Sequence, residues 1–166
     1  MTIIWRVFDN LSLIKKYKLF FNPPSIINLI KFLALPRRER VWYEPIQVSC
    51  YITDRCTLKC NFCPHHSLYQ NKNYPFLHST LQDMSFETFR KIIDTFPETF
   101  RITLAGVGEP FLNRNIFKMI DYAISKRKLV TVISNGTLLK DNLDELLNRK
   151  IFSLCISLNV ESQIEY

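Results

Sequence analysis

Residues 46–63 read IQVSCYITDRCTLKCNFC and join a β-type run directly to a group of cysteines. Cys56, Cys60 and Cys63 follow the run with a C-x3-C-x2-C spacing. Zinc sites usually show two C-x2-C pairs, so this spacing is wrong for them. It also offers three thiolates where a closed four-iron cluster takes four. The pattern therefore predicts an iron–sulfur cube that keeps one iron free to bind a small molecule.

Beyond the cysteines, the sequence predicts alternating helices and strands. A polar and aromatic loop covers residues 64–84. Helices are expected from Ser85 onward and over 116–124 and 138–147, and strands over 100–105, 129–133 and 152–158, after the first strand at 46–52. This alternation predicts an α/β fold with parallel strands and right-handed crossovers. Ligands of such folds bind at the carboxyl ends of the strands.

Polar residues follow each predicted strand. Gly106-Val107-Gly108-Glu109-Pro110 comes after the second strand and Ser134-Asn135-Gly136 after the third, and Ser157 and Asn159 end the fourth. Because the ends of parallel strands meet at one edge of a sheet, these residues and the three cysteines are expected to form one site.

The cysteine motif, with Phe62 before its last cysteine, resembles the cluster motif of the radical S-adenosylmethionine (SAM) enzymes. The run Gly106 to Pro110 resembles the second signature of that family, which meets the methionine end of SAM. It begins 43 residues after Cys63, at the end of the next predicted strand. The resemblance covers about residues 46–160. It implies a partial (β/α) barrel of the radical SAM type.

The resemblance also implies the chemistry. Cys56, Cys60 and Cys63 would hold three irons of a [4Fe-4S] cluster, while the amino and carboxylate groups of SAM chelate the fourth. An electron from the reduced cluster would split SAM and yield a 5′-deoxyadenosyl radical, which abstracts hydrogen from a substrate that the sequence does not identify. The chain would then be an oxidoreductase supplied by an electron donor such as a flavodoxin or a ferredoxin.

The family's cofactor contacts map onto specific residues of this chain. Gly106 and Gly108 would let the backbone approach SAM closely, and Glu109 would offer a carboxylate to its ammonium group. The full set of expected SAM contacts is Phe62, Gly106, Gly108, Glu109, Pro110, Ser134, Asn135, Ser157 and Asn159.

Other readings of the same residues stay open. The three cysteines are also compatible with a zinc site completed by Cys50, His65 or His66, or with a cluster-binding module that has no catalysis. Glu109 is equally suited to a helix N-terminus. Asn135-Gly136 is a common turn dipeptide.

The two cysteines outside the motif are expected to lie elsewhere. Cys50 lies within the first strand and is expected in the core. Cys155 shares a strand face with Ser157 but is predicted to be a small buried core residue.

Residues 1–45 are predicted to form a basic helical extension, separate from the incomplete barrel domain of residues 46–166. They contain eight basic and three acidic side chains, so they carry +5 of the net charge of +7. A helix is expected over 11–21, and a second begins after the N-cap Ser25 and runs to residue 35. The extension would suit a peripheral membrane surface, nucleic acid or an acidic partner, or would simply pack on the barrel.

The family barrel has six βα units, and this sequence supplies four strands, so the barrel is expected to be truncated. The missing half would come from a partner chain or from a longer gene product. No secretory signal is evident, which favours a reducing cytoplasm for the five cysteines. The longest apolar stretch is about half of the roughly 20 residues that a membrane span needs.

Overall fold

The computed structural model describes residues 22–34, 41–69, 73 and 81–158 of the chain. A sheet of four parallel strands lies at its centre, in the order β1-β2-β3-β4. The strands are β1 (Gln47–Tyr51), β2 (Arg101–Ala105), β3 (Leu129–Ser134) and β4 (Ser153–Ile156). The predicted α/β fold with parallel strands is confirmed, and the strand order is that of a partial barrel.

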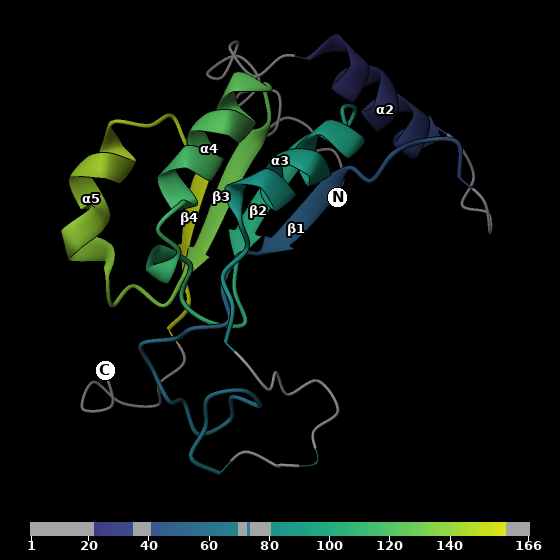
Figure 1. The fold of residues 1–166 in the computed structure, drawn as a ribbon. Coiled ribbons are helices and arrows are strands. Elements are labelled where there is room, and N and C mark those ends of the chain that lie inside the picture. The colour runs from purple at the N-terminus through teal and green to yellow at the C-terminus, as the bar shows by residue number, and fades with distance from the viewer. Residues whose placement is uncertain (1–21, 35–40, 70–72, 74–80, 159–166) are drawn as a thin grey trace, which may run out of the picture.

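Helices follow the strands as the sequence predicts. The structure contains α3 (Phe86–Thr95), α4 (Ile116–Ser125), α5 (Leu139–Leu147) and the short 3-10 helix η2 (Pro110–Leu112). In Figure 1, α3 and α4 lie against one face of the sheet and α5 lies beside α4. Ser85 caps α3, because its side chain accepts a hydrogen bond from the Thr88 amide at 3.1 Å.

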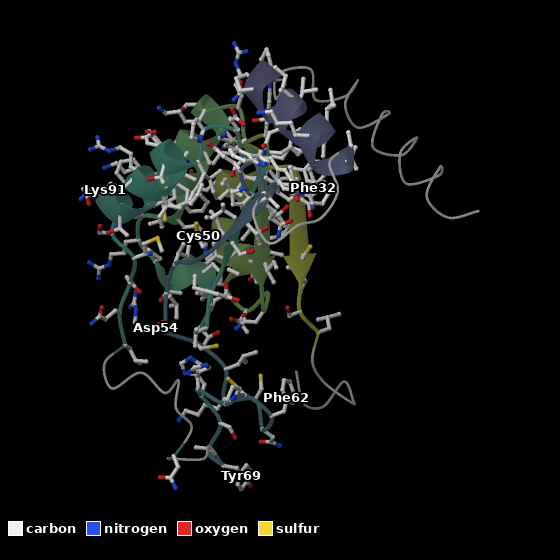
Figure 2. All side chains as sticks on the ribbon, turned by 90° about the vertical axis from the view of Figure 1, so that its right-hand side faces the viewer. Phe32, Cys50, Asp54, Phe62, Tyr69 and Lys91 are labelled. Carbon is white, nitrogen blue, oxygen red and sulfur yellow. The ribbon has the colours of Figure 1, made fainter. Side chains whose placement is uncertain are left out.

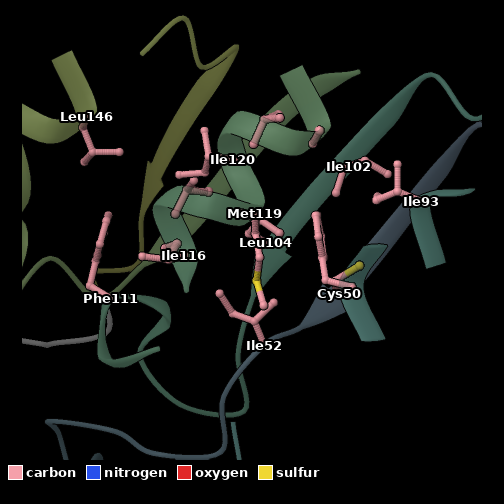
Figure 3. Close-up of a cluster of buried hydrophobic side chains, with 14 residues drawn as sticks. Cys50, Ile52, Ile93, Ile102, Leu104, Phe111, Ile116, Met119, Ile120 and Leu146 are labelled. Carbon is pink, nitrogen blue, oxygen red and sulfur yellow. The ribbon is translucent and has the colours of Figure 1, made fainter. Parts of the chain in front are cut away.

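The hydrophobic core lies between the sheet and these helices. Helix α4 buries Ile116, Met119, Ile120 and Ala123, whose spacing of three and four residues puts them on one face. The strand residues that meet them alternate along each strand, as a period of two requires. Figure 3 shows the core residues that these elements bring together, among them Cys50, Ile52, Ile102, Leu104, Leu146 and Phe111.

The other face of the sheet is partly open. It carries Tyr51 and Ile133, both exposed, and the buried hydroxyls of Thr103 and Thr131. Cys155 also lies on this face and is exposed, so the prediction that it is a core residue was wrong. The reason is its place on β4, which lies at the edge of the sheet, with its side chain turned away from α3 and α4.

Helix α2 (Pro23–Ala34) lies outside the barrel elements. The sequence predicted that Ser25 caps this helix, and this prediction was wrong. The helix begins at Pro23, and the side chain of Ser25 is buried, where it donates to the carbonyl of Thr99 at 3.2 Å. Two prolines fit the first turn, because their missing amide hydrogens have no intrahelical partner there.

Two of the expectations fall on residues outside the described part. They are the helix over 11–21 and the site residue Asn159. Among the described helices, none has the length and apolar content that crossing a membrane requires.

Candidate functional site

The carboxyl ends of β1, β2 and β3 are joined by hydrogen bonds. The loop that carries the cysteines extends from this edge of the sheet, beyond the arrowheads of the strands in Figure 1. The backbone amides of Gly108 and Glu109 donate to the carbonyls of Thr53 and Arg55, at 3.2 and 2.7 Å. The segment before the cysteines and the loop after β2 therefore run side by side.

The close approach of these two segments requires glycine at position 108. A Cβ atom on Gly108 would overlap the backbone of Arg55, and one on Gly106 would collide with the carbonyl of Gly108. The absence of a side chain thus lets two backbone segments touch. The two glycines that the sequence placed near SAM have a structural role in packing this loop.

Arg55 and Asp83 stabilise the base of the cysteine loop. The guanidinium donates to Asp83 Oδ1 from Nε at 3.1 Å and also to the carbonyl of Leu112. Thr53 donates to the same carboxylate at 2.6 Å. Burial raises the pKa of Asp83, but the hydrogen bonds from Arg55 and Thr53 outweigh it and hold this pKa below its usual value.

Asn113 was not among the predicted site residues, and its side chain joins the same region from the inside. Its buried side-chain amide donates to the carbonyls of Ile52 and Met84 at 2.6 and 3.0 Å. It thereby connects the end of β1 to the segment before α3. The signal for it was weak, because one asparagine after a short helix is usual in turns.

Glu109 lies at the centre of the strand ends. Its side chain is buried and accepts hydrogen bonds from the hydroxyl of Ser134 at 2.8 Å and the amide of Asn135 at 2.7 Å. It also caps η2, accepting from the Phe111 amide at 3.3 Å. A carboxylate has about four acceptor sites, so three donors from the chain leave it little free capacity.

Asn135 connects the cysteine motif to the hydrogen-bonded residues around Glu109. The Asn135 side-chain amide lies 3.0 Å from Thr57 Oγ1 and 3.7 Å from Cys56 Sγ. Thr57 in turn lies 2.6 Å from Thr137 Oγ1. Thr57 and Thr137 were not among the predicted residues, although their positions, next to a cysteine and after an Asn-Gly turn, offered a signal.

Backbone and side-chain N–H groups point at two of the cysteine sulfurs. The amide of Leu58 donates to Cys56 Sγ at 3.4 Å, and that of His66 to Cys63 Sγ at 3.3 Å. Donors of this kind stabilise thiolates and influence the potentials of iron–sulfur clusters. A turn, closed by the Cys63 amide and the Cys60 carbonyl at 2.9 Å, connects the last two cysteines.

The Cys56 thiol is partly buried. Burial raises the pKa of Cys56, and the hydrogen bonds from Leu58 and Asn135 offset this only in part. Because metals bind the thiolate, loading of this cysteine must release a proton.

The donor set fits an iron–sulfur cluster. All three cysteines of the motif are free thiols of intermediate burial, and thiolates are the usual ligands of such clusters. Within the described residues, no three His, Cys, Asp or Glu side chains converge on the position of one metal ion. A cube differs from a single ion in this respect, because each thiolate binds a different iron.

Three other predicted residues do not join the hydrogen-bonded group around Glu109 and Asn135 through their side chains. Phe62 is exposed on the cysteine loop, at the end of the molecule shown at the bottom of Figure 2. Pro110 is buried at the start of η2. Ser157 contacts this group of strand-end residues through its backbone, whose amide donates to the Ser134 carbonyl at 2.8 Å.

The structure removes one of the alternative zinc ligands. Cys50 is buried in the hydrophobic core, as predicted, and burial raises its pKa to about 11. It therefore does not face the cysteine loop. The pKa of His66 is lowered, first by burial and then by the neighbouring His65, and a hydrogen bond with the backbone of Asp54 opposes this.

Comparison with known proteins places residues 50–162 in the family model described as the radical SAM superfamily. The chain is 29% identical over 123 residues to the antilisterial bacteriocin subtilosin biosynthesis protein AlbA of Bacillus subtilis, covering 71% of this chain and 25% of that protein. It is 31% identical over 112 residues to a GTP 3′,8-cyclase of Syntrophomonas wolfei, covering 62% of this chain and 32% of that protein.

A solved structure shares the fold. BtrN, crystallised in complex with AdoMet and 2-DOIA, superposes with a TM-score of 0.56 at 17% identity, over 71% of this chain and 47% of that one. The chain spans about a quarter to a third of the length of the two curated relatives.

Proposed function

The chain belongs to the radical SAM superfamily, and from this premise we propose that it binds a [4Fe-4S] cluster through Cys56, Cys60 and Cys63 and cleaves SAM reductively. The observation that supports the proposal most directly is the contact of Asn135 with Cys56 Sγ, at 3.7 Å. It connects the cysteine motif to the strand-end residues that the family uses for SAM.

When bound, the cluster would supply one electron to the SAM sulfonium, giving methionine and a 5′-deoxyadenosyl radical that takes a hydrogen atom from a substrate. The residues of the chain would hold and orient the reactants. The three thiolates would fix three corners of the cube, and the backbone at Gly106 and Gly108 would form the wall that SAM approaches.

Glu109 is proposed to act in two ways. Its main task is positioning, since it holds the β3 end through Ser134 and the Asn135 amide. The remaining acceptor capacity of its carboxylate would suit the ammonium group of SAM. Glu109 would then both orient Asn135 toward the iron–sulfur cluster and contact SAM.

Two further parts of the proposal rest on the family alone. An external donor such as a flavodoxin or a ferredoxin would deliver the electron. Strands from a longer chain or a partner would complete the barrel. The substrate class is left open, because the matched relatives carry different names and the chain covers a minor part of each.

The test is anaerobic reconstitution with iron and sulfide, followed by electron paramagnetic resonance of the dithionite-reduced protein with and without SAM. We expect a reduced-cluster signal that changes when SAM is added, together with formation of 5′-deoxyadenosine. A cluster signal that is indifferent to SAM would instead indicate a cluster-binding module without catalysis. Stoichiometric zinc with no cluster would contradict the proposal.

Matched cysteine variants identify the ligands. Replacing Cys56, Cys60 or Cys63 by Ala should abolish the cluster, because each loss leaves one iron without a protein ligand. The Cys155→Ala variant is the control, since Cys155 is an exposed cysteine outside the motif. Full iron content in a Cys60→Ala variant would contradict the assignment.

A further inference from the structure

The side chain of Asn135 lies where the loop after β3 meets the cysteine motif. Its Oδ1 atom accepts two hydrogen bonds from Thr137, one from the backbone amide at 3.0 Å and one from the hydroxyl at 2.8 Å. Its Nδ2 atom donates to Thr57 Oγ1 at 3.0 Å and to Cys56 Sγ at 3.7 Å. An amide side chain has two lone pairs and two hydrogens for such bonds, so both ends of Asn135 are engaged by the chain.

The orientation of this amide group is fixed by a donor that has no alternative. A backbone N–H can only donate, so the atom of Asn135 that faces the Thr137 amide must be the oxygen. The nitrogen at the other side of the amide therefore faces Thr57 and Cys56. The hydrogen-bond network thus assigns Asn135 as a donor to the sulfur, which the shape of the side chain alone does not do.

Three side chains form a closed ring of hydrogen bonds at this point. Thr137 donates to Asn135, Asn135 donates to Thr57, and the hydroxyl oxygens of Thr57 and Thr137 lie 2.6 Å apart. Because the hydroxyl hydrogen of Thr137 is used by Asn135, Thr57 donates the third bond. Hydrogen bonds in a chain polarise one another, so the ring strengthens each of its members.

The backbone of Asn135 is held from the side of the sheet. Its amide donates to Oε2 of the buried Glu109 at 2.7 Å, and the hydroxyl of Ser134 donates to Oε1 of the same carboxylate at 2.8 Å. Ser134 Oγ also accepts from the amide of Gly136 at 2.9 Å. The position of the Asn135 side chain is therefore set at the end of β3 and does not depend on the cysteine loop alone.

This donor differs in origin from the backbone donors at the cysteine sulfurs. The Leu58 amide faces Cys56, two positions before it. The His66 amide faces Cys63, three positions before it. Both of these amides belong to the cysteine loop itself, whereas Asn135 lies 79 positions from Cys56. Because Asn135 contributes a side chain, a substitution removes its N–H and leaves the backbone of the loop intact.

An N–H group that faces a thiolate ligand affects the reduction of an iron–sulfur cluster. Reduction adds one negative charge to the cluster and its thiolates, and the positive end of the N–H dipole stabilises that charge. Hydrogen bonds to the sulfurs therefore raise the reduction potential, and they are among the factors that set it. Cys56 is of intermediate burial, so water screens this interaction only in part.

We propose that Asn135 is a positioning residue that raises the reduction potential of the cluster through its N–H donor to Cys56, and that the ring with Thr57 and Thr137 holds this donor in place. The inference rests on the proposed function for the presence of the cluster and not for the cleavage of SAM. It is therefore tested without SAM.

The first measurement is a redox titration of the reconstituted full-length chain with dithionite, followed by electron paramagnetic resonance. Asn135→Ala removes the donor. Asn135→Asp also places a carboxylate oxygen near the sulfur, while it keeps the oxygen that accepts from Thr137. The potential should become more negative from the unaltered chain to Asn135→Ala and again to Asn135→Asp. For Asn135→Asp the reduction equilibrium should change about tenfold or more, which is about 59 mV for one electron.

Thr57→Val separates the donor from the ring. It removes the hydroxyl that accepts from Asn135, while the Thr137 amide still fixes Asn135 Oδ1 and leaves the nitrogen facing Cys56. We expect a clearly smaller change in potential than for Asn135→Ala. Asn142→Ala is the matched control, because its side-chain amide donates to a backbone carbonyl at the start of α5, at 2.8 Å. This control should leave the potential unchanged.

The cluster-free protein gives a second readout. Hydrogen–deuterium exchange of peptides that cover residues 55–60 reports how firmly the ring holds the cysteine loop. We expect exchange there to become several-fold faster in Asn135→Ala and in Thr57→Val, because each variant breaks the ring. Peptides from α4 should exchange as in the unaltered chain, which verifies that the variants are folded.

Two results would overturn the proposal on the potential itself. Equal potentials for the unaltered chain and both Asn135 variants would show that the donor has no effect on the cluster. A change in Thr57→Val as large as that in Asn135→Ala would assign the effect to the ring and not to the N–H donor.

The other contradicting results concern the loop and the loading of the cluster. Unchanged exchange over residues 55–60 in both ring variants would show that the ring does not hold the loop. Folded Asn135 variants that take up no cluster would make this residue one for cluster assembly. An unaltered chain that takes up no cluster would contradict the proposed function as well, which distinguishes that failure from the others.

Discussion

The hydroxyl of Ser134 donates a hydrogen bond of 2.8 Å to Oε1 of Glu109, and both side chains are buried. Ser134 is the last residue of β3, whereas Glu109 lies in the loop after β2, and the two are 25 positions apart in the sequence. The contact is therefore a direct link between the ends of two neighbouring strands. With the amides of Asn135 and Phe111, it satisfies a buried carboxylate that has no cationic partner among the described residues.

Replacing Glu109 by Gln should weaken this link. The amide would place an NH2 group against at least one donor, so the buried donors from Ser134, Asn135 and Phe111 would not all be satisfied. We expect the free energy of unfolding to fall by about 1–3 kcal/mol, measured by urea denaturation of the cluster-free protein. Glu98→Gln is the control, because Glu98 makes a partly exposed ion pair with Lys31 at 3.9 Å, and it should cost less than about 1 kcal/mol. Equal effects of the two changes would contradict this role of Glu109.

Gly108→Ala should be far more damaging than Gly136→Ala. The new Cβ at position 108 would overlap backbone atoms of Arg55, which cannot rotate away. Gly136 has a φ of 83°, so alanine there adds only the strain of a left-handed conformation, about 1–2 kcal/mol. We expect Gly136→Ala to fold with a lowered thermal midpoint and Gly108→Ala to lose cooperative unfolding. Similar midpoints for both would show that the two backbone segments separate easily.

The two cysteines outside the motif should differ in reactivity. Cys155 is exposed, whereas Cys50 is buried and has its pKa raised from 9.0 to about 11. At pH 8 iodoacetamide should modify Cys155 in the folded protein and spare Cys50 until denaturant is added, as peptide mass spectrometry will determine. The raised pKa also means that stability falls as the pH rises from 9.0 toward 11, because the unfolded thiol ionises first. Modification of both cysteines at the same rate would contradict the buried position of Cys50.

Asp83 should make the protein sensitive to acid. Its pKa is lowered from 3.8 because the bonds from Arg55 and Thr53 outweigh the effect of burial. The stabilisation is therefore present above pH 3.8 and is lost as the pH falls through the lower pKa of the folded state. Asp83→Asn should be less stable at pH 6 by about 1 kcal/mol or more, and the difference should shrink below pH 3.8. The measurement is urea denaturation of the cluster-free proteins at each pH, and a difference that is constant with pH would refute the explanation.

The elements of the barrel could be predicted from the sequence because their signals are local. Apolar residues at helical spacing in α4, such as Ile116, Met119 and Ile120, mark both the helix and its buried face. Ser85 indicates where α3 begins, because serine is a preferred residue at helix N-caps. Parallel pairing follows from the alternation of strands and helices, since consecutive parallel strands need a crossover.

The burial of single residues could not be predicted in the same way. Cys155 has the same side chain as Cys50, yet it is exposed because β4 is an edge strand and its outer face meets no helix among the described residues. Ser25 looked like a cap, but its hydroxyl is used by the Thr99 carbonyl, 74 positions away. The cost of leaving that carbonyl unpaired depends on what else packs there, which no local pattern contains.

The sequence by itself determined the family, the order of strands and helices, and the three thiolates, because each depends on residue types at short spacing. Tertiary structure decided that Glu109 meets Ser134, that Gly108 meets Arg55, and that α2 turns Ile27, Ile30 and Leu33 outward. The physical reason is that hydrogen bonds and steric overlap act over a few ångströms. Only the folded chain brings residues from distant positions within that range.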